Sequence, residues 1–490
     1  MDERSSMVTR PPRAPWWARL FESVDIASLV CFRIAFGVLM LAEVFRYLPR
    51  VSRYYIEPEF HFTYFGFDWV QPLPGEWMYV HFGVLGLAAL FITIGLFYRV
   101  SASVFFLGLS YVFLVEQARY LNHIYLLCLI SFIMIFVPAH RALSVDAWLR
   151  PKLRSQTAPA WALWLVRFQI GVPYFFGGVA KINADWLQGE PLRMWLAHRA
   201  DHPLYGSLMT EEWVVYFFSY AGLVFDLLIV PAMLWRKTRV PAFLAALCFH
   251  FINGNIFTIG IFPWVMAAAT LIYFPPDWPR QVGRRFLKLV GVQTIADPPL
   301  PPPPPPPPPT TLGPRRALLL GVLGTYVAWQ MLMPLRHWLY PGDVAWTEEG
   351  HKFAWRMKLR DKRGSVVFVA TDPASGRTWR INPRKHLARW QVGEMTGRPE
   401  MILQFAHHIA DKLRDKGYPD VEVRAIAAIS LNGRPPRLMI DPDVDLTRVE
   451  RSIWPASWIL RDPPPLEPSI LPQKPAKAPE EAAGANVTEL

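Results

Sequence analysis

Long apolar runs, separated by short polar loops, fill the first two thirds of the chain. A run of roughly 20 mainly apolar residues is long enough to cross a bilayer as a helix. The last two runs before residue 275 form one stretch that Asn253, Gly254 and Asn255 interrupt. We predict a polytopic α-helical membrane protein with about nine transmembrane helices, near residues 25–45, 77–97, 100–117, 121–138, 160–180, 213–235, 239–256, 258–274 and 316–335.

The pattern changes after residue 335. Three runs rich in β-branched residues, at 365–371, 421–431 and 437–440, are typical of strands. Between the first two, apolar residues recur at helical spacing from Met401 to Leu413. We therefore expect a C-terminal α+β domain at 336–462, which follows a membrane domain at 25–335.

One further segment of the C-terminal domain alternates apolar with polar residues, as a half-buried strand does. Its apolar positions are Phe353, Trp355, Met357 and Leu359, and we expect them to lie on a strand. The last residues, 463–490, are rich in Pro, Ala, Glu and Lys, which predicts a disordered tail.

The composition agrees with a membrane protein. Apolar residues make up 52% of the chain, which has 21 Trp, 17 Tyr and 32 Phe, as expected for aromatic belts. The net charge of +12 could suggest a nucleic-acid partner, but the basic residues lie in short loops between apolar runs. We therefore expect no nucleic-acid partner. The three cysteines, Cys31, Cys128 and Cys248, lie inside apolar runs and offer no disulfide framework.

Lys and Arg in the loops predict the orientation, because cytoplasmic loops are enriched in them. If residues 1–24 are cytoplasmic, the cytoplasmic side carries 18 of these residues and the other side carries 7. Nine spans then place the domain at 336–462 outside the cytoplasm. Residues 1–24 are polar and basic, which argues against a cleavable signal peptide. The proline run at 298–309 would be a stiff spacer in a cytoplasmic loop, with an SH3-type ligand as the alternative.

Lys181 stands at the end of the fifth apolar run. A cation at membrane depth is costly and is usually paired, hydrated or functional. A lysine taken out of water loses its proton more readily and becomes a neutral amine, which is a base. The alternative is a lysine that extends from a helix end to the lipid headgroups. Lys181 alone leaves both interpretations open.

Several other polar residues are predicted to lie at the depth of Lys181. Each could be a helix–helix hydrogen-bonding group, but several at one depth indicate a buried site in a cavity. They are Asn122 and His123 at the start of the fourth span, with Glu116 and Arg119 just before it, and His250, Asn253 and Asn255 at the end of the seventh.

The chemistry open to these groups is limited. The sequence has no HExxH motif, no glycine-rich phosphate loop and no GxSxG motif. A lysine and two histidines make a poor metal site without a carboxylate or thiolate at matching spacing, so we predict no metal. A neutral lysine beside histidine and asparagine suits proton abstraction from a weakly acidic, lipophilic ligand.

Other features of the spans have structural interpretations. Gly177 and Gly178 should allow close helix approach beside the lysine. We interpret each further ionisable residue inside a span as half of a structural ion pair. These residues are Arg33, Glu43, Arg167 and Asp226.

Many spaced motifs run through the chain: PLPGEWMY (72–79), GLFYRVSA (95–102), LNHIYL (121–126), HRALSVDAWL (140–149), FFGGVAKINADWLQG (175–189), HFINGNIFTIGIFPWVM (250–266), PPDWPR (275–280), WTEEGHKFAWRM (346–357), INP (381–383) and DPDVD (441–445). In this order they resemble the vitamin K-dependent gamma-glutamyl carboxylases over about residues 25–450. The membrane region is also similar to a broader prokaryotic family of horizontally transferred transmembrane (HTTM) domains, whose members need not be carboxylases.

The resemblance implies a membrane enzyme of the carbon–carbon lyase class. Such an enzyme oxidises reduced vitamin K with O2 to the 2,3-epoxide. The strong base formed on the way removes a γ proton from a peptide glutamate, which then adds CO2. The co-substrates would be a menaquinone- or phylloquinone-type hydroquinone, O2 and CO2, with no metal or nucleotide.

The resemblance also implies roles for particular residues. Lys181 falls on the family's catalytic lysine, and Asn122 and His123 fall on the pair that hydrogen-bonds the quinone oxygen. His250 and Asn255 fall in another segment near the quinone site. Trp355 and its neighbour His351 fall in the segment that faces the glutamyl substrate.

The sequence also departs from the family. Ala180 stands where animal enzymes have a second lysine, and Gly350 and His351 replace bulkier residues in the glutamate-facing segment. We therefore expect quinone epoxidation, with weak or no carboxylation of animal-type peptides. The alternatives are a quinone epoxidase with a different or lost carboxylation substrate, or a non-enzymatic quinone- or lipid-binding membrane protein. The absence of a disulfide framework favours a bacterial inner membrane.

Overall fold

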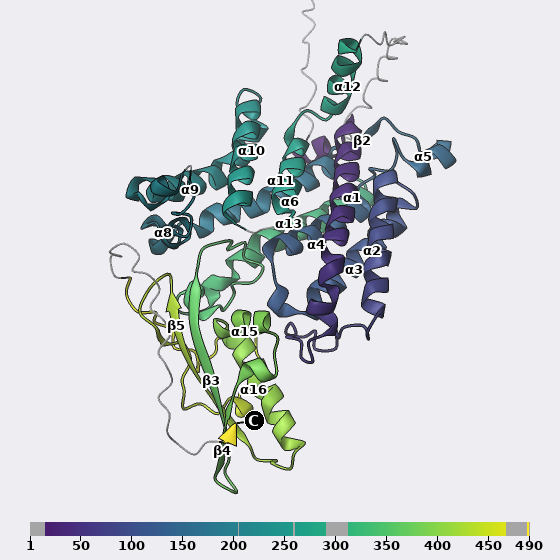
Figure 1. The fold of residues 1–490 in the computed structure, drawn as a ribbon. Coiled ribbons are helices and arrows are strands. Elements are labelled where there is room, and N and C mark those ends of the chain that lie inside the picture. Colours follow the sequence, from purple (N-terminus) through teal and green to yellow (C-terminus); the bar gives the residue numbers. More distant parts are fainter. Residues whose placement is uncertain (1–14, 204, 258–259, 291–311, 467–487, 490) are drawn as a thin grey trace, which may run out of the picture.

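The computed structural model describes residues 15–203, 205–257, 260–290, 312–466 and 488–489. Most of the N-terminal segment, the predicted proline spacer at 298–309 and most of the predicted tail lie outside these ranges. The described residues form a helix bundle with a smaller sheet-containing domain at one end (Figure 1).

Six helices of the bundle are long and apolar enough to cross a membrane, which agrees with a polytopic helical membrane protein. In chain order they are α1 (Ala27–Tyr47), α2 (Trp77–Ile94), α3 (Tyr98–Val115), α6 (Ala160–Ala180), α9 (Glu212–Leu234) and α13 (Pro314–Leu332).

The other three predicted spans are helical but do not meet this standard. They are α4 (Asn122–Phe136), α10 (Arg239–Ile256) and α11 (Phe262–Thr270). The helices α4 and α11 are shorter than a full span, and polar residues enter the last turn of α10. The predicted count of nine transmembrane helices is therefore not confirmed.

Shorter elements connect the bundle. The strands β1 (Ser23–Asp25) and β2 (Thr157–Pro159) pair antiparallel beside the first residues of α1 and α6. The remaining short helices are α5 (Val145–Leu149), α7 (Ala184–Leu187), α8 (Leu192–Ala197), α12 (Trp278–Leu289) and α14 (Val344–Thr347). In Figure 1, α5, α12 and β2 lie at the end of the bundle opposite the C-terminal domain.

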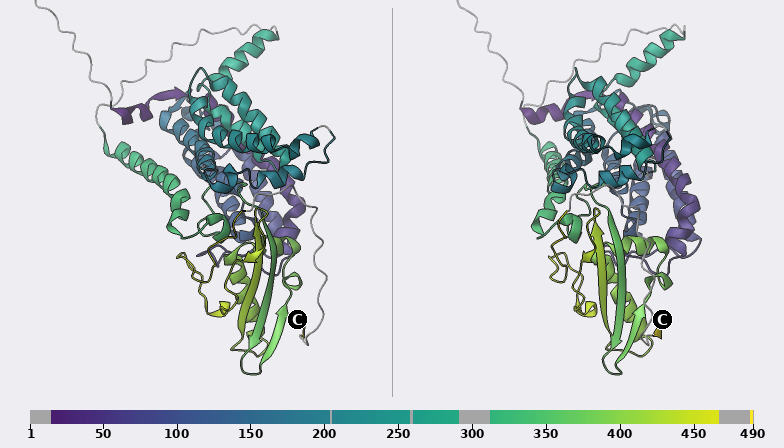
Figure 2. Two further views of the ribbon diagram at one scale, coloured as in Figure 1. Left: turned by 90° about the vertical axis from the view of Figure 1, so that its left-hand side faces the viewer. Right: turned by 60° about the vertical axis from the view of Figure 1, so that its left-hand side comes forward.

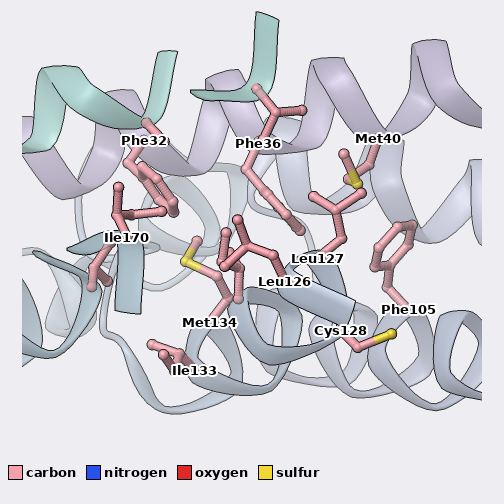
Figure 3. Packing of buried hydrophobic residues seen from close by; sticks show 14 of the residues in the cluster. Phe32, Phe36, Met40, Phe105, Leu126, Leu127, Cys128, Ile133, Met134 and Ile170 are labelled. Atoms are coloured by element: carbon pink, nitrogen blue, oxygen red, sulfur yellow. The ribbon is translucent and has the colours of Figure 1, made fainter. Parts of the chain in front are cut away.

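The core of the bundle forms where α1 packs against α3, α4 and α6 (Figure 3). Phe36 of α1 meets Phe105 of α3 edge to face, with ring centroids 6.0 Å apart. Leu126 and Ile170 complete this layer from α4 and α6, and both are fully buried. Because aromatic and branched side chains interlock here, the helices have fixed relative positions.

The intramembrane charges are satisfied in two ways. Glu43 pairs with Arg46, whose Nε lies 2.7 Å from Oε2, and Asp226 also forms an ion pair. The ion pairs expected for Arg33 and Arg167 are wrong. Arg33 donates instead to the backbone oxygen of Ala139, and Arg167 donates to two backbone oxygens just after α11. Backbone carbonyls at helix ends provide acceptors that a sequence pattern does not reveal.

The C-terminal domain has the predicted α+β composition. Its strands are β3 (Lys362–Asp372), β4 (Arg377–Ile381), β5 (Glu422–Leu431), β6 (Arg437–Leu438) and β7 (Thr488–Glu489), in the sheet order β6-β5-β3-β4-β7. The helices α15 (Arg389–Thr396) and α16 (Pro399–Arg414) cover one face of the sheet (Figure 2). Phe405 of α16 packs on Phe368 of β3, with ring centroids 4.9 Å apart. The strands predicted at 365–371, 421–431 and 437–440 and the helix predicted from Met401 to Leu413 are confirmed.

Polar contacts attach this domain to the bundle. Arg434 makes a two-pronged ion pair with Asp185 of α7, with N–O distances of 2.6 and 2.7 Å. Gln391 of α15 donates to Glu116 at 3.0 Å, and Gln404 of α16 donates to Gln117. Because bidentate and buried hydrogen bonds fix orientation, they hold the domain against one end of the helix bundle.

Candidate functional site

Lys181 lies at the C-terminal end of α6 and is buried, with 7% of its surface exposed. Its Nζ forms a short contact with Oδ2 of Asp226, which α9 contributes. Nζ also donates to the backbone oxygen of Gly177 at 3.3 Å. The lysine therefore does not extend to the lipid headgroups, because it points to a carboxylate between two helices of the bundle.

Two glycines bring α6 and α9 together at this point. A Cβ on Gly178 would lie 2.7 Å from side-chain atoms of Leu227, and one on Gly177 would lie 3.1 Å from Oδ2 of Asp226. Only the absence of a side chain allows this approach. The predicted close helix contact is confirmed, and it brings Asp226 within reach of the lysine.

Trp186 forms a further wall of the lysine site. Its ring centroid lies 5.3 Å from Nζ of Lys181, within the range of a cation–π contact. Trp186 is held by its Nε1, which donates to the backbone oxygen of Ser219 at 2.9 Å. Asn183 caps the short helix α7 and thus fixes the turn between Lys181 and this ring.

His250 reaches the same face of α6 from α10. Its Nε2 lies 2.6 Å from the hydroxyl of Tyr174, which is seven positions before Lys181 and therefore two helical turns away. His250 is 4% exposed. The ring of Phe262 lies 6.5 Å from His250 and 5.4 Å from His123. These contacts place both histidines around one phenylalanine.

Asn122 and His123 begin α4. The Oδ1 of Asn122 accepts a hydrogen bond from the hydroxyl of Tyr120 at 3.0 Å, and this hydroxyl accepts one from the backbone N–H of Phe353 at 2.6 Å. No hydrogen bond of the His123 ring is found among the described residues. The asparagine is therefore tied to the C-terminal domain, while the histidine keeps its ring nitrogens available.

The segment around Trp355 enters the helix bundle. Trp355 is fully buried and its ring centroid lies 5.0 Å from that of Tyr125 on α4. A Cβ on Gly177 would lie 3.5 Å from Cε of Met357, so this methionine sits beside the lysine site. The segment thus brings the C-terminal domain next to Lys181.

The strand expected for this segment is wrong. Phe353, Trp355 and Lys358 all have positive φ angles, of 64°, 56° and 52°. Left-handed residues break a strand and are costly for residues other than glycine, so packing must hold them. The alternation of apolar residues reflects side chains that turn into the bundle rather than one face of a sheet.

Three buried N–H groups of this segment have no hydrogen-bond partner within the described ranges. They are Trp355 Nε1, Arg356 Nε and His351 Nδ1. Arg356 is 8% exposed, and burial lowers its pKa to about 10, so it stays charged at neutral pH. A buried guanidinium without a hydrogen-bonded carboxylate is costly, which makes it a candidate receptor for an acidic ligand.

Gly350 and His351 have structural contacts. A Cβ on Gly350, whose φ is +71°, would lie 2.6 Å from Cα of His337. His351 Nε2 lies 2.5 Å from Nη1 of Arg360. The same guanidinium donates two hydrogen bonds to the carboxylate of Glu348. Burial, together with Arg360, holds the pKa of His351 well below its usual range, so this ring stays neutral.

Two groups of the predicted cluster lie elsewhere. Asn255 is exposed, and its amide donates to the backbone oxygen of Phe251. Glu116 is fully buried between the bundle and the C-terminal domain, where it accepts from Gln391 and from the backbone N–H of Ala118. These contacts do not bring Asn255 or Glu116 to Lys181.

A cavity of about 40 Å³ lies between α1, α2, α3 and α4. Apolar side chains line most of it, and Glu43, Tyr47 and Arg119 add polar atoms. Ile124, next to His123, also lines it, whereas Lys181 does not. The described part of the chain contains no group of three or more His, Cys, Asp or Glu that could hold a metal ion.

Sequence reasoning did not assign Asp226, Tyr174, Tyr120 or Arg356 to the site. The sequence contained a clue to Asp226, because an acidic residue inside one span and a basic residue at the end of another can form an ion pair. It also contained one to Tyr174, since this residue lies seven residues before Lys181 and shares its helix face. For Arg356 there was no such clue, because the irregular backbone around it decides that its buried Nε has no hydrogen-bond partner within the described residues.

Residues 21–278 match the HTTM domain, and residues 315–463 match the lumenal domain of vitamin K-dependent gamma-carboxylase. The two matches cover the helix bundle with the Lys181 site and the C-terminal domain with the Trp355 segment. No solved structure matches the chain at a significant level.

Proposed function

Since this chain belongs to the vitamin K-dependent gamma-glutamyl carboxylase family, we propose that it oxidises a vitamin K-type hydroquinone with O2 to the epoxide and couples this step to γ-carboxylation of a peptide glutamate. The observation that carries the proposal is the buried contact of Lys181 with Asp226, beside the segment that contains Trp355. Lys181 is the base, and Asp226 is its hydrogen-bond partner.

Nζ of Lys181 and Oδ2 of Asp226 are in hydrogen-bond contact, so one proton can lie on either atom. When the shared proton is on Asp226, Nζ of Lys181 keeps a free lone pair and can accept the hydroxyl proton of the hydroquinone. The ammonium formed in this way remains in contact with the carboxyl oxygen of Asp226, the backbone oxygen of Gly177 and the face of Trp186. These neighbours stabilise it without exposure to water.

The quinone oxygens need hydrogen-bond partners inside an apolar bundle. We assign this role to His123 and His250, which flank Phe262, and to Asn122. The Tyr174 hydroxyl holds the ring of His250 and fixes its orientation. Asn122 Oδ1 already accepts from Tyr120, so its amide nitrogen is the atom left to donate to a quinone oxygen.

The glutamate half of the site would be the segment that enters the bundle. Arg356 supplies a buried positive charge for the γ-carboxylate, and Trp355 Nε1 supplies a further unpartnered donor. Met357 lies next to Gly177, so a glutamate held by this segment is close to the oxidised quinone. Because the same segment covers the lysine site, it also limits the access of water to the strong base formed there.

A second candidate is a quinone epoxidase that carboxylates a different substrate or none. The contacts of His351 favour this second candidate. His351 falls in the segment expected to face the glutamate, but it lies against Arg360 and Glu348 rather than beside Lys181. In this variant the hydroquinone is still oxidised at Lys181, and water quenches the base.

The test uses the purified full chain in lipid nanodiscs with reduced vitamin K, O2, labelled bicarbonate and a glutamate-containing peptide. Epoxide and peptide-bound label are measured separately. We expect epoxide in every case, with label in the peptide if the glutamate half is active. Epoxide without label would identify the second candidate, and the absence of both from a folded protein would refute an oxidative function.

A further inference from the structure

The helix α12 (Trp278–Leu289) has two chemically distinct faces. At 100° per residue, Trp278, Val282, Phe286 and Leu289 fall within one arc of about 80°, while Arg284 lies on the opposite side. Arg285 and Lys288 both lie on one side of the apolar arc, about 20° and about 80° from its edge at Trp278. This combination of a basic face and a face with Trp, Phe and Leu is typical of helices that lie in a membrane surface.

The rest of the described protein does not cover the apolar face. Val282 is 53% exposed, Phe286 is 63% exposed and Leu289 is 86% exposed, and α12 has no buried residue. Figure 2 shows the helix projecting from the bundle at the end opposite the C-terminal domain. Exposed apolar side chains on one face of a helix indicate an interaction surface.

Within the described ranges, the hydrogen bonds between α12 and the bundle come from its first turn. Arg280 Nε lies 2.9 and 3.0 Å from the two carboxylate oxygens of Asp25, and its Nη2 lies 2.5 Å from Gln156. The backbone oxygen of Pro276 accepts from the N–H of Ser28 at the start of α1. The helix is therefore fixed at the level where α1 begins, and its second half extends away from the anchor.

The position of α12 favours a bilayer as its partner. The helix lies at an end of the membrane-spanning bundle, near the level at which α1 and α6 start. Other exposed apolar residues at this end are Trp148 and Leu149 of α5. A protein partner would not require four basic residues in a helix of this length, whereas anionic phosphates attract them.

We propose that α12 docks on the bilayer surface on the side opposite the C-terminal domain and binds anionic phospholipid headgroups. Val282, Phe286 and Leu289 enter the acyl-chain boundary, and Arg284, Arg285 and Lys288 contact the phosphates. Arg280 remains paired with Asp25 and anchors the helix. This docking does not depend on the chemistry at Lys181.

The test places the photoreactive amino acid benzoylphenylalanine at Phe286 of the full chain, with the same amino acid at Arg284 as the matched control. Each protein is irradiated in nanodiscs of phosphatidylcholine alone or with added phosphatidylglycerol, and lipid adducts are measured by mass spectrometry. We expect several-fold more adduct at Phe286 than at Arg284, and more in the anionic discs.

A second variant isolates the charge. The combined substitutions Arg284→Glu, Arg285→Glu and Lys288→Glu, in the chain labelled at Phe286, should abolish the gain from phosphatidylglycerol. Because each basic residue near an anionic surface contributes roughly fivefold, the three together should change occupancy of the surface by on the order of a hundredfold. Equal adducts at Phe286 and Arg284, or cross-linking of Phe286 to a second protein chain instead of lipid, would overturn the proposal.

Discussion

At the scale of single residues, a carboxylate determines what Lys181 can do. An isolated lysine in a bilayer would carry a costly unpaired charge, whereas Asp226 gives Nζ of Lys181 a hydrogen-bonded partner. The neighbours of the pair are a backbone oxygen and an aromatic ring, neither of which competes for the proton. In the proposed function the lysine acts as the base, and its charged partner in this site is Asp226.

Arg356 allows the two halves of the site to be separated. We predict that Arg356→Gln lowers carboxylation at least tenfold, mainly through KM for the peptide, and leaves epoxide formation within twofold. A charged hydrogen bond to a carboxylate is worth about 1.5–3 kcal/mol, which corresponds to this loss. The control is Arg363→Gln, because Arg363 is an exposed residue of β3 whose side chain pairs with its near neighbour Asp361. Equal losses of epoxide and carboxylate in Arg356→Gln would contradict the assignment.

The residue scale also shows what the sequence could predict. The place of Lys181 at the end of an apolar run left its burial open, and only the further polar residues predicted at its depth indicated a buried site. The glycine contact followed from Gly177 and Gly178. The sequence did not predict Asp226 as the partner of the lysine, because a single sequence does not show which of several spans packs against α6. The left-handed backbone at Trp355 was equally hidden, since an apolar–polar alternation predicts a strand.

At the scale of elements, the contact of α6 with α9 brings Lys181 and Asp226 together. We predict that Gly178→Ala lowers stability by about 1–3 kcal/mol, because its new Cβ would overlap Leu227 and push α9 away. Epoxide formation should fall with it, since Asp226 directly precedes Leu227 in the chain and moves with α9. The matched control is Gly324→Ala in α13, where no atom lies within 4 Å of the new Cβ.

Thermal unfolding in one detergent measures both variants. The Gly324→Ala protein should unfold at or slightly above the temperature of the original, because alanine favours a helix over glycine. An unchanged unfolding temperature and full epoxidation in Gly178→Ala would show that α6 and α9 do not depend on this close approach.

The C-terminal domain carries a charge cluster whose stability should depend on pH. Burial opposes the ionisation of Glu348, but Arg360 and Lys362 outweigh it and hold the pKa of Glu348 well below its usual range. Burial and Arg360 hold the pKa of His351 well below its usual range as well. In both cases the unfolded chain binds a proton at a higher pH than the folded domain does. Acid therefore favours unfolding.

We predict a loss of stability that begins near pH 6.5, where an unfolded histidine titrates, and steepens below about pH 4.5. Each group contributes at most about 1.4 kcal/mol per pH unit. His351→Phe should remove the upper part of this dependence and keep the lower part. Hydrogen exchange of β3 and β5 in the full chain from pH 7 to pH 4 measures it, and identical profiles in both proteins would contradict the role of His351.

At the scale of the whole molecule, the two ends of the bundle differ in character. One end binds the C-terminal domain through Asp185, Glu116 and Gln117, and the other carries α5, α12 and the β1–β2 pair. The sequence predicted this division from the loop charges. The sequence did not determine the number of membrane-spanning helices. Taken alone, α4 and α11 are short and α10 ends in polar residues, so whether each crosses the membrane depends on its neighbours.

The orientation in the membrane remains a prediction with a direct test. We expect the C-terminal domain to lie outside the cytoplasm, because the Lys- and Arg-rich loops lie at the opposite end of the bundle. Phosphatase and green fluorescent protein reporters fused after residue 462 distinguish the two sides. An active phosphatase with a dark fluorescent protein is the expected result, and the reverse pattern would place the domain in the cytoplasm.

The most direct test of the central claim measures epoxide formed from reduced vitamin K by the full chain in nanodiscs. Wild-type protein is compared with Lys181→Ala, Asp226→Asn and the double variant, and with Lys152→Ala as an exposed-lysine control. The account predicts loss of at least a hundredfold in the three site variants, with the double variant no worse than Lys181→Ala, because residues that act as a unit are not additive. A small added amine should restore part of the activity of Lys181→Ala only. Full epoxidation by a correctly folded Lys181→Ala protein would contradict the account.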